Sequence, residues 1–230
     1  MMPKTLFAGA VAATLLCLPA IASAQTRHDE QVWVNLTSMG PLSGDLVYFA
    51  ELQPRTGDGS SRLDQLLLRG AIGVKLDKAV TLYQGYAHVV VPVAGGRDIN
   101  EERSFQQASW TIKASPAGEL SSRTRFEQRW RSVGGGMGLR LREMLRYETP
   151  LKPGTKGPNA LVYSEVFVAL NDTRWGARSG FDQMRNFVGL EIPVGGASTV
   201  EAGYLNQLID QPAGRSRMNH VAALTLFFRH

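Results

Sequence analysis

The chain has 230 residues, a formal net charge of +5, one cysteine and four histidines. A single cysteine excludes a disulfide framework and a cysteine-rich metal site, so an exported form of the chain depends on its own packing and hydrogen bonding. The basic balance is compatible with nucleic-acid binding, but the arginines alternate along apolar stretches instead of gathering in a tail. We therefore expect a solvated cationic face and no nucleic-acid partner.

The first 24 residues have the three parts of a secretory signal peptide. Lys4 supplies the positive start, residues 5–18 are apolar, and residues 22–24 (Ala-Ser-Ala) match a small-residue cleavage site. The apolar part is too short for a membrane-spanning helix. Cys17 admits a lipoprotein as an alternative, but cleavage after residue 24 discards it. The mature chain then has about 206 residues, which suits one β-barrel domain at residues 25–230.

The mature chain shows long alternating runs of apolar and polar residues and no sustained helical periodicity. Clusters of Gly, Pro, Asn and Asp separate the runs, with residues 39–41 (Met-Gly-Pro) as the first break. We count eleven runs, two of which form a hairpin at residues 119–148. The runs are 32–38, 45–53, 63–76, 80–91, 103–113, the two hairpin strands, 161–170, 181–192, 199–209 and 219–229.

Most of these runs span ten to thirteen residues. Strands of soluble domains average about five to six residues, whereas tilted strands that cross a bilayer need about nine to eleven. Short turns such as 77–78 and 115–118 also tend to alternate with longer loops such as 55–61, 92–100 and 171–180, as in outer-membrane barrels. The sequence therefore predicts an all-β fold, an antiparallel transmembrane up-and-down barrel in the outer membrane. A soluble periplasmic β-sandwich that binds a ligand is the alternative.

The expected strand count follows from how such barrels close. Bacterial outer-membrane barrels have even numbers of strands, so eleven runs indicate that one strand is missed or that two are joined. We expect twelve strands, with ten as the alternative. We also expect a monomer whose partners are outer-membrane lipid and the barrel insertion machinery.

The hairpin at residues 119–148 carries one charged face. A period of two places alternate side chains on the same side of a strand, so seven arginines share a face with two glutamates, and leucines and aromatics occupy the other. The charged face consists of Arg123, Arg125, Glu127, Arg129, Arg131, Arg140, Arg142, Arg146 and Glu148. Glu143 is the one breach in the apolar face. The charged face lines a wet lumen in a membrane barrel and is surface in a sandwich.

Four strand-like motifs extend this pattern over nearly the whole mature chain. They are Glu102-Arg103-Ser104-Phe105-Gln106-Gln107, Arg123-Thr124-Arg125-Phe126-Glu127-Gln128-Arg129, Glu165-Val166-Phe167 and Glu201-Ala202-Gly203-Tyr204-Leu205-Asn206. Gly85-Tyr86 and Trp33 accompany them. With these motifs the chain resembles the bacterial proteins grouped as domain of unknown function 2490. The resemblance implies an exported outer-membrane β-barrel, and it brings no known activity, catalytic residue or cofactor.

The alternating charges leave two interpretations of the lumen open. Arginine forks bind carboxylates and phosphates, and arginine-lined pores favour anions, which indicates a narrow channel for small anionic or polar solutes. Ten to twelve strands enclose little more space than side chains fill, so a closed structural barrel plugged by Arg–Glu pairs is the alternative. The residues expected to line the lumen and contact solute are Glu51, Arg123, Arg125, Glu127, Arg129, Arg131, Arg140, Arg142, Arg146, Glu165, Arg185 and Glu201.

The sequence carries no motif of a zinc protease, a serine hydrolase elbow or a phosphate-binding loop. No histidine has a second histidine at metal-ligand spacing. His220 beside Asn219 is compatible with a lipid-hydrolysing barrel, but nothing in the sequence places a serine near it. We expect no enzymatic activity, no cofactor and no metal.

Overall fold

The computed structural model describes residues 26–230, which form eleven strands and one turn of 3-10 helix. The signal peptide expected at residues 1–24 lies outside the described residues. The strands are β1 (Thr26–Ser43), β2 (Leu46–Gly57), β3 (Arg62–Lys75), β4 (Val80–Val91), β5 (Ile99–Ser115), β6 (Gly118–Arg131), β7 (Met137–Pro150), β8 (Asn159–Ala169), β9 (Gly180–Gly195), β10 (Ser198–Gln211) and β11 (Arg215–Arg229), with the 3-10 helix η1 (Pro212–Gly214) between the last two.

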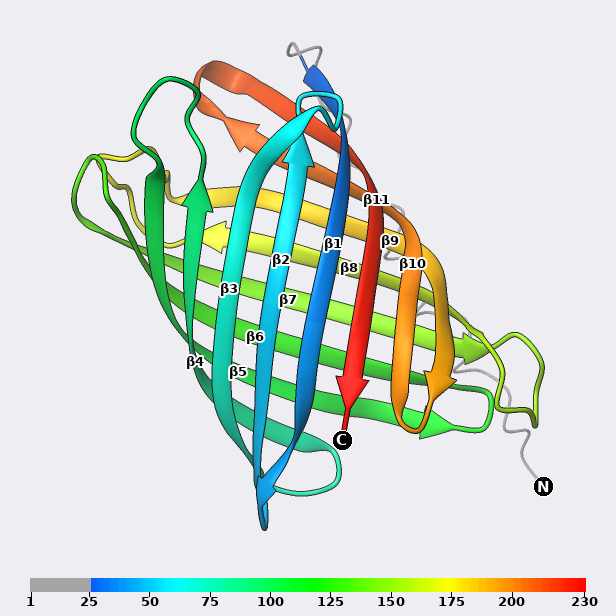
Figure 1. Ribbon diagram of the computed structural model, residues 1–230. Coiled ribbons are helices and arrows are strands. Elements are labelled where there is room, and N and C mark those ends of the chain that lie inside the picture. The colour runs from blue at the N-terminus through cyan, green and yellow to red at the C-terminus, as the bar shows by residue number, and fades with distance from the viewer. Residues whose placement is uncertain (1–25) are drawn as a thin grey trace, which may run out of the picture.

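The strands form one sheet that closes on itself as a barrel (Figure 1). Each strand pairs antiparallel with the next, and β1 then pairs parallel with β11, from Thr26 opposite Ser216 to Met39 opposite Arg229. The expectation of twelve or ten strands is wrong, because the eleven runs of the sequence correspond to eleven strands. A closed sheet needs an even number of strands only when every neighbouring pair is antiparallel, and the parallel seam removes that need. The sandwich alternative is also wrong, since a single closed sheet replaces two facing ones.

Several strands extend beyond the runs expected from the sequence. β1 begins at Thr26 and continues through Gly40 and Pro41, where we expected a break, and β2 continues through Arg55 to Gly57, where we expected a loop. A register shift between Pro41 and Ser43 interrupts the β1–β2 ladder, which accommodates a proline that has no N–H to donate. The neighbouring strands continue beside these segments, and their ladder hydrogen bonds override the local turn signals.

The two ends of the barrel differ in the length of their connections. At one end, the short-turn end, the strands are joined by residues 44–45, 76–79, 116–117, 151–158 and 196–197, of which 151–158 is the one long connection. At the other, the long-loop end, the connections are 58–61, 92–98, 132–136, 170–179 and η1. Because the strand count is odd, β1 begins at the long-loop end and β11 finishes at the short-turn end, where the backbone N–H of His230 donates to the Met39 carbonyl.

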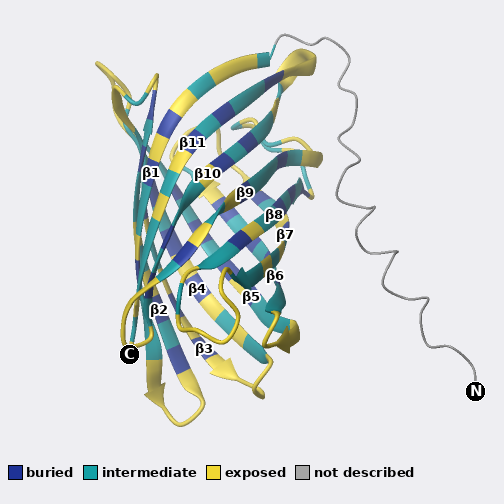
Figure 2. Ribbon diagram, turned by 90° about the vertical axis from the view of Figure 1, so that its right-hand side faces the viewer, coloured by how far each residue is buried: buried dark blue, intermediate teal, exposed yellow. Residues whose placement is uncertain are grey.

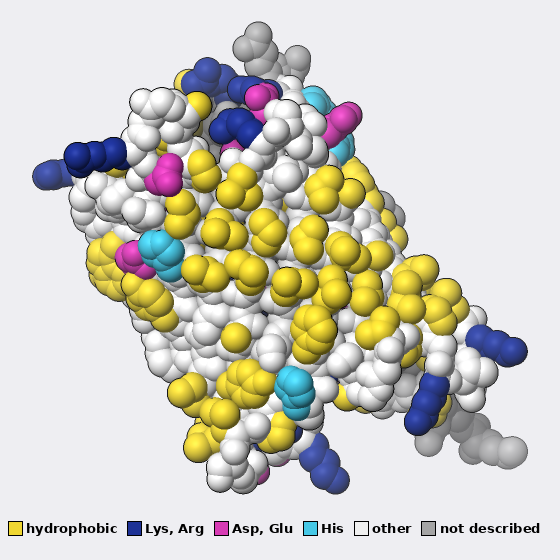
Figure 3. Space-filling view, in the orientation of Figure 1, with side chains coloured by type: hydrophobic (Ala, Val, Ile, Leu, Met, Phe, Trp, Pro, Cys, Tyr) yellow, Lys and Arg dark blue, Asp and Glu magenta, His cyan; other side chains and the backbone are white. Residues whose placement is uncertain are grey.

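Charged side chains are buried inside the barrel, and large apolar side chains are exposed outside it. Arg125 and Glu127 are 2% and 1% exposed, whereas Ile72 and Val188 are 60% and 56% exposed. Along most strands buried and exposed residues follow each other in alternation (Figure 2). In the view of Figure 3 hydrophobic side chains form a broad band across the middle of the face made by β1–β3 and β11, and most charged side chains lie above and below it. In residues 26–230 we find no helix with the length and apolar character to cross a membrane.

The outer surface of β4–β7 carries polar groups among its apolar ones. Gln84, Gln106 and Gln128 form a ladder across β4, β5 and β6, with Nε2–Oε1 distances of 2.8 Å and 2.9 Å. Glu143, the breach in the apolar face of the hairpin, accepts hydrogen bonds from two hydroxyl groups of β6. Because these groups satisfy one another, moving them out of water costs less than it would for isolated polar groups.

Phe105 fills the barrel interior beside Gly85. Its side chain is 1% exposed and packs with Phe49 and Ala71, and a Cβ atom on Gly85 would overlap its ring. We predict that Gly85→Ala lowers the free energy of unfolding by about 1–3 kcal/mol through overpacking, as measured by urea titration of the purified barrel.

Gly70→Ala is the matched control for this prediction. The nearest heavy atom to a Cβ on Gly70 is the Phe49 carbonyl oxygen at 4.0 Å, so we expect no comparable loss of stability. Equal losses in the two variants would contradict the close packing of Phe105 on Gly85.

Candidate functional site

Two neighbouring strands, β6 and β7, supply much of the charge inside the barrel. In their register Glu127 lies opposite Arg140, and Arg125 lies opposite Arg142. Side chains alternate along each strand, so these four residues point inward and the residues between them point outward. The four residues are 1–4% exposed. Charges removed from water to this extent require partners of opposite sign.

Glu127 and Glu165 act as the centres of one continuous ion-pair network. Glu127 Oε2 accepts hydrogen bonds from Arg140, with Nε at 2.9 Å, and Glu127 Oε1 accepts one from Arg142 Nη1 at 2.7 Å. Glu165 on β8 accepts bonds from Arg142 at 2.7 Å and 3.0 Å and from Arg123 at 2.8 Å. Arg142 therefore bridges both carboxylates, and the network joins three strands by charge-assisted hydrogen bonds.

A second charged cluster lies closer to the long-loop end. Glu101 on β5 accepts hydrogen bonds from Arg103 at 2.8 Å and Arg129 at 2.6 Å, and the Arg131 Nε atom lies 3.7 Å from it. Trp175, in the loop 170–179, covers Arg129 and Arg131, whose guanidinium carbons lie 5.0 Å and 5.6 Å from its ring centroid. These contacts hold the loop against the charged cluster at the long-loop end.

Two further ion-pair groups lie inside the barrel. Arg146 on β7 contacts three carboxylates: Glu148 at 2.7 Å, Glu191 at 3.0 Å and Glu201 at 2.5 Å. On the other side, Glu51 of β2 pairs with an arginine of β3 at 2.6 Å. The structure thus distributes ion pairs around most of the inner wall.

All twelve residues expected to line the lumen take part in these inner ion pairs. Sequence reasoning missed further charged residues, among them the ion-paired Arg69, Glu101, Arg103, Asp182 and Glu191 and the glutamine-bonded Arg55. Most of these are isolated charges in otherwise neutral runs, and Arg55 fell in a segment expected to be a loop. Their spacing of two from other inward positions, such as Glu101 and Arg103 before Phe105, is the signal that could have found them.

Several of the arginines pack against the faces of aromatic rings. The guanidinium carbons of Arg142 and Arg185 lie 4.4 Å and 4.7 Å from the centroid of Phe167. Arg55 lies 4.0 Å from the Trp33 ring centroid and donates hydrogen bonds to two glutamine side chains. Cation–π contacts of this kind are stronger where water is excluded, so these rings take part in holding the buried cations.

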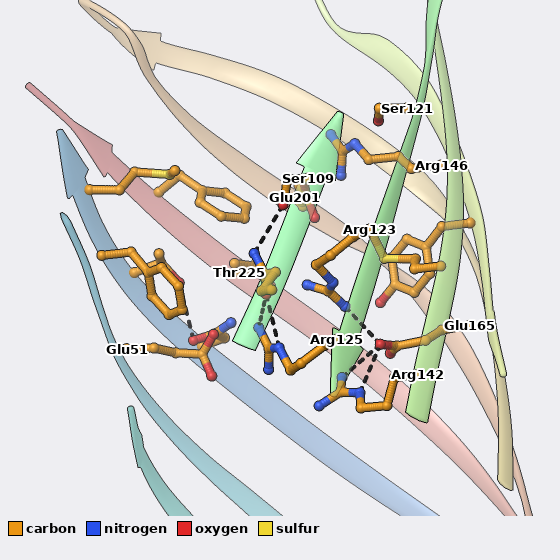
Figure 4. Close-up of a pocket in the computed structure, with 18 of the residues that line it drawn as sticks. Glu51, Ser109, Ser121, Arg123, Arg125, Arg142, Arg146, Glu165, Glu201 and Thr225 are labelled. Carbon is orange, nitrogen blue, oxygen red and sulfur yellow. Dashed lines mark hydrogen bonds and ion pairs between the residues drawn. The ribbon is translucent and has the colours of Figure 1, made fainter. Parts of the chain in front are cut away.

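A cavity of about 470 Å³ occupies the part of the lumen nearer the short-turn end. Its lining reaches Lys78 and Ala79 in a connection at that end, and Arg125 and Arg142 bound it on the side of the network. Figure 4 shows Arg123 and Arg142 converging on Glu165, with Arg125 beside them. Eight cationic side chains and four carboxylates line the cavity, so its wall carries a surplus of positive charge.

His220, the residue considered for hydrolysis, lies away from this cavity. Its ring stacks on His28, with Nε2 2.9 Å from Nδ1 of that residue, and its Nδ1 lies 2.6 Å from the Tyr204 hydroxyl. Within residues 26–230 no serine is among its hydrogen-bond partners, and no group of three or more His, Cys, Asp or Glu side chains has the arrangement of a metal site.

Fold and lumen together define a closed β-barrel with a charged, densely paired interior. The family described as "Protein of unknown function (DUF2490)" matches residues 30–219, and the chain belongs to it. An uncharacterised protein of Methylorubrum extorquens is 49% identical over 216 residues, which cover 94% of each chain. No solved structure matches the chain.

The ion-pair network predicts a large stability effect at Glu165. Glu165→Gln keeps the shape of the side chain but leaves Arg123 without its carboxylate partner and Arg142 with Glu127 alone. We expect the free energy of unfolding to fall by about 3–5 kcal/mol, measured by urea titration. Glu30→Gln, at an exposed carboxylate of β1, is the control and leaves the unfolding midpoint unchanged. A midpoint that Glu165→Gln does not move would show that the network contributes nothing to stability.

Proposed function

We propose that this protein is an outer-membrane β-barrel whose lumen is closed in the resting state by its Arg–Glu network. The observation that carries the proposal is the placement of charge. Buried carboxylates and guanidinium groups fill the interior, while leucine, isoleucine and valine side chains are exposed on the outside. A water-soluble barrel gains nothing from this arrangement, whereas a bilayer favours it because lipid solvates the apolar side chains.

The lengths of the strands and connections support membrane insertion. The strands have 11–18 residues, enough for a tilted crossing of the hydrocarbon layer. Short turns face the periplasm in such barrels, so the short-turn end and the C-terminus are periplasmic. The first residues of β1 are then at the outer surface. A cleaved signal peptide, expected at residues 1–24, supplies the export step.

A closed lumen fits the geometry better than an open channel. The network centred on Glu127 and Glu165 spans β6, β7 and β8, and a second cluster around Glu101 lies beyond it under Trp175. Ions would have to break several buried charge-assisted hydrogen bonds to pass. The cationic surplus of the cavity favours anions if the network opens, and a narrow anion channel is for that reason the second candidate.

Membrane insertion predicts a specific behaviour on extraction. We expect the protein to stay in the outer-membrane fraction after washes with high salt and with alkaline carbonate, because lipid holds the apolar outer face. We also expect the unheated protein to run faster than the boiled protein on a gel, as folded barrels do. Release of the protein by the carbonate wash would contradict the proposal.

The closed lumen predicts the absence of current. In planar bilayers we expect no conductance steps from the wild-type protein, because the network blocks the lumen. The double variant Glu127→Ala with Arg140→Ala removes one carboxylate and one cation from the network, and we expect it to give anion-preferring steps. Steady conductance by the wild-type protein would overturn the closed state and favour the channel.

A further inference from the structure

The cavity contains a buried guanidinium group that lacks a full set of partners. Arg125 is 2% exposed, and its Nε and Nη2 atoms both donate to the same neutral acceptor, Gln107 Oε1. Its Nη1 atom is buried and has no hydrogen-bond partner among the described residues. The nearest carboxylate oxygen, on Glu127, is 4.0 Å away. A buried donor of positive charge without an acceptor is costly, and the Arg125 side chain lines the cavity.

Other cations of the cavity wall are also incompletely paired. Arg123 bonds to Glu165 through Nη2, while its buried Nε has no partner in the described part of the chain. Arg55 bonds only to the amide oxygens of Gln53 and Gln65. These residues line the same cavity. The excess positive charge of the cavity wall therefore comes from these arginines and not from the net charge of the whole chain.

The opposite wall of the cavity carries an apolar patch beside polar residues such as Thr37 and Glu51. Met39, Phe49 and Tyr83 pack together on β1, β2 and β4, with the Phe49 and Tyr83 ring centroids 5.5 Å apart, and Phe227 of β11 joins them in the lining. In the order of an eleven-stranded barrel, β1, β2 and β11 lie across the lumen from β6 and β7. The cavity therefore has Arg123 and Arg125 on one wall and an apolar patch on the facing wall.

We propose that this cavity binds a small amphipathic anion, a carboxylate or phosphate group carried on an aromatic or short aliphatic body. The guanidinium groups of Arg125 and Arg123 receive the anionic group, and the rings of Phe49 and Tyr83 contact the apolar body. Guanidinium forks match carboxylate and phosphate oxygens, and a volume of about 470 Å³ is in the range of sites for small organic ligands. The proposal rests on the closed lumen, which makes the cavity a site and not a passage.

The route of entry follows from the position of the lining. The cavity borders the connection at residues 76–79 and the start of β6 at Glu119, both at the short-turn end, whereas the ion-pair network lies between it and the long-loop end. A ligand therefore enters from the short-turn end, which faces the periplasm in the proposed orientation.

The test is isothermal titration of the folded barrel in dodecyl maltoside micelles, with empty micelles as the blank. The ligands are benzoate and phenyl phosphate, with benzyl alcohol as the neutral counterpart and inorganic phosphate as the anion without an apolar body. We expect saturable binding of the two aromatic anions and none of benzyl alcohol. Inorganic phosphate is expected to bind at least about tenfold more weakly than phenyl phosphate, because contact between the phenyl ring and the apolar patch strengthens the binding of phenyl phosphate.

Two variants locate the site, and folding is verified by heat-modifiable gel mobility. Arg125→Gln is expected to weaken binding of phenyl phosphate by about tenfold or more, whereas Arg97→Gln, at an exposed residue of the 92–98 connection, leaves it unchanged. If Arg125→Gln does not fold, Thr225→Trp serves in its place. This substitution fills the cavity from β11 and replaces no arginine, and we expect it to abolish binding.

Several outcomes overturn the site. The first is the absence of saturable heat with both aromatic anions. The second is that benzyl alcohol binds as tightly as the aromatic anions, or that inorganic phosphate binds as tightly as phenyl phosphate. The third is that phenyl phosphate binds a folded Arg125→Gln or Thr225→Trp variant as tightly as it binds the wild-type protein. The result is separable from that for the closed lumen. A wild-type barrel that conducts but binds phenyl phosphate refutes only the closed state, and a silent barrel that binds none of the ligands refutes only the site.

Discussion

The pairing of buried arginines with buried glutamates is the constraint on which the rest of the structure depends. A lone guanidinium or carboxylate inside the barrel would cost several kcal/mol, yet the interior contains many of both. They are tolerable because Glu101, Glu127 and Glu165 each contact more than one arginine, so the charges form networks and not isolated pairs. These networks connect the neighbouring strands β5, β6, β7 and β8. The same bonds that stabilise the barrel lie inside its lumen, so in the closed state that we propose, stability and closure have one physical cause.

The parallel seam between β1 and β11 has consequences for the chain ends. In a barrel with an even number of antiparallel strands the first strand starts and the last strand ends on the same side, whereas here the start of β1 and the end of β11 lie at opposite ends. The seam is long, with fourteen residue pairs in register from Thr26 to Met39, so an odd count does not leave a weak edge. At the long-loop end, Trp175 packs on Arg129 and Arg131. The cavity remains toward the short-turn end, and Arg125, whose Nη1 atom has no hydrogen-bond partner among the described residues, is one of the residues that line it.

Much of the fold could be predicted from the sequence, because alternation over ten or more residues has few structural solutions. The inward arginines of β6 and β7 followed directly from their spacing of two. The predicted strand count was wrong because we adjusted a correct count of eleven runs to the general rule that such barrels have an even number of strands. Nothing in the local sequence of β1 or β11 indicates that these two strands pair parallel. Glu101 was missed because its partner Arg129 is distant in sequence and becomes a neighbour only through the register of the sheet, and Arg55 was missed because it lay in a segment that we expected to be a loop. Nor could the unpartnered Nη1 atom of Arg125 be inferred, since it depends on where the Gln107 side chain lies.

The account depends above all on which side of the strands meets lipid, and a nitroxide scan along β3 measures this directly. Cysteine substituted singly at Leu68, Ile72, Leu67 and Ala71 is labelled in the mature chain, and the collision rates of the labels with oxygen and with a water-soluble nickel complex are compared in bilayers. Leu68 and Ile72 are exposed, and Leu67 and Ala71 are buried. The account predicts that labels at Leu68 and Ile72 collide readily with oxygen and rarely with nickel, and that labels at Leu67 and Ala71 are shielded from both. Frequent collisions of nickel with the labels at Leu68 and Ile72 would place the apolar face in water and contradict the account.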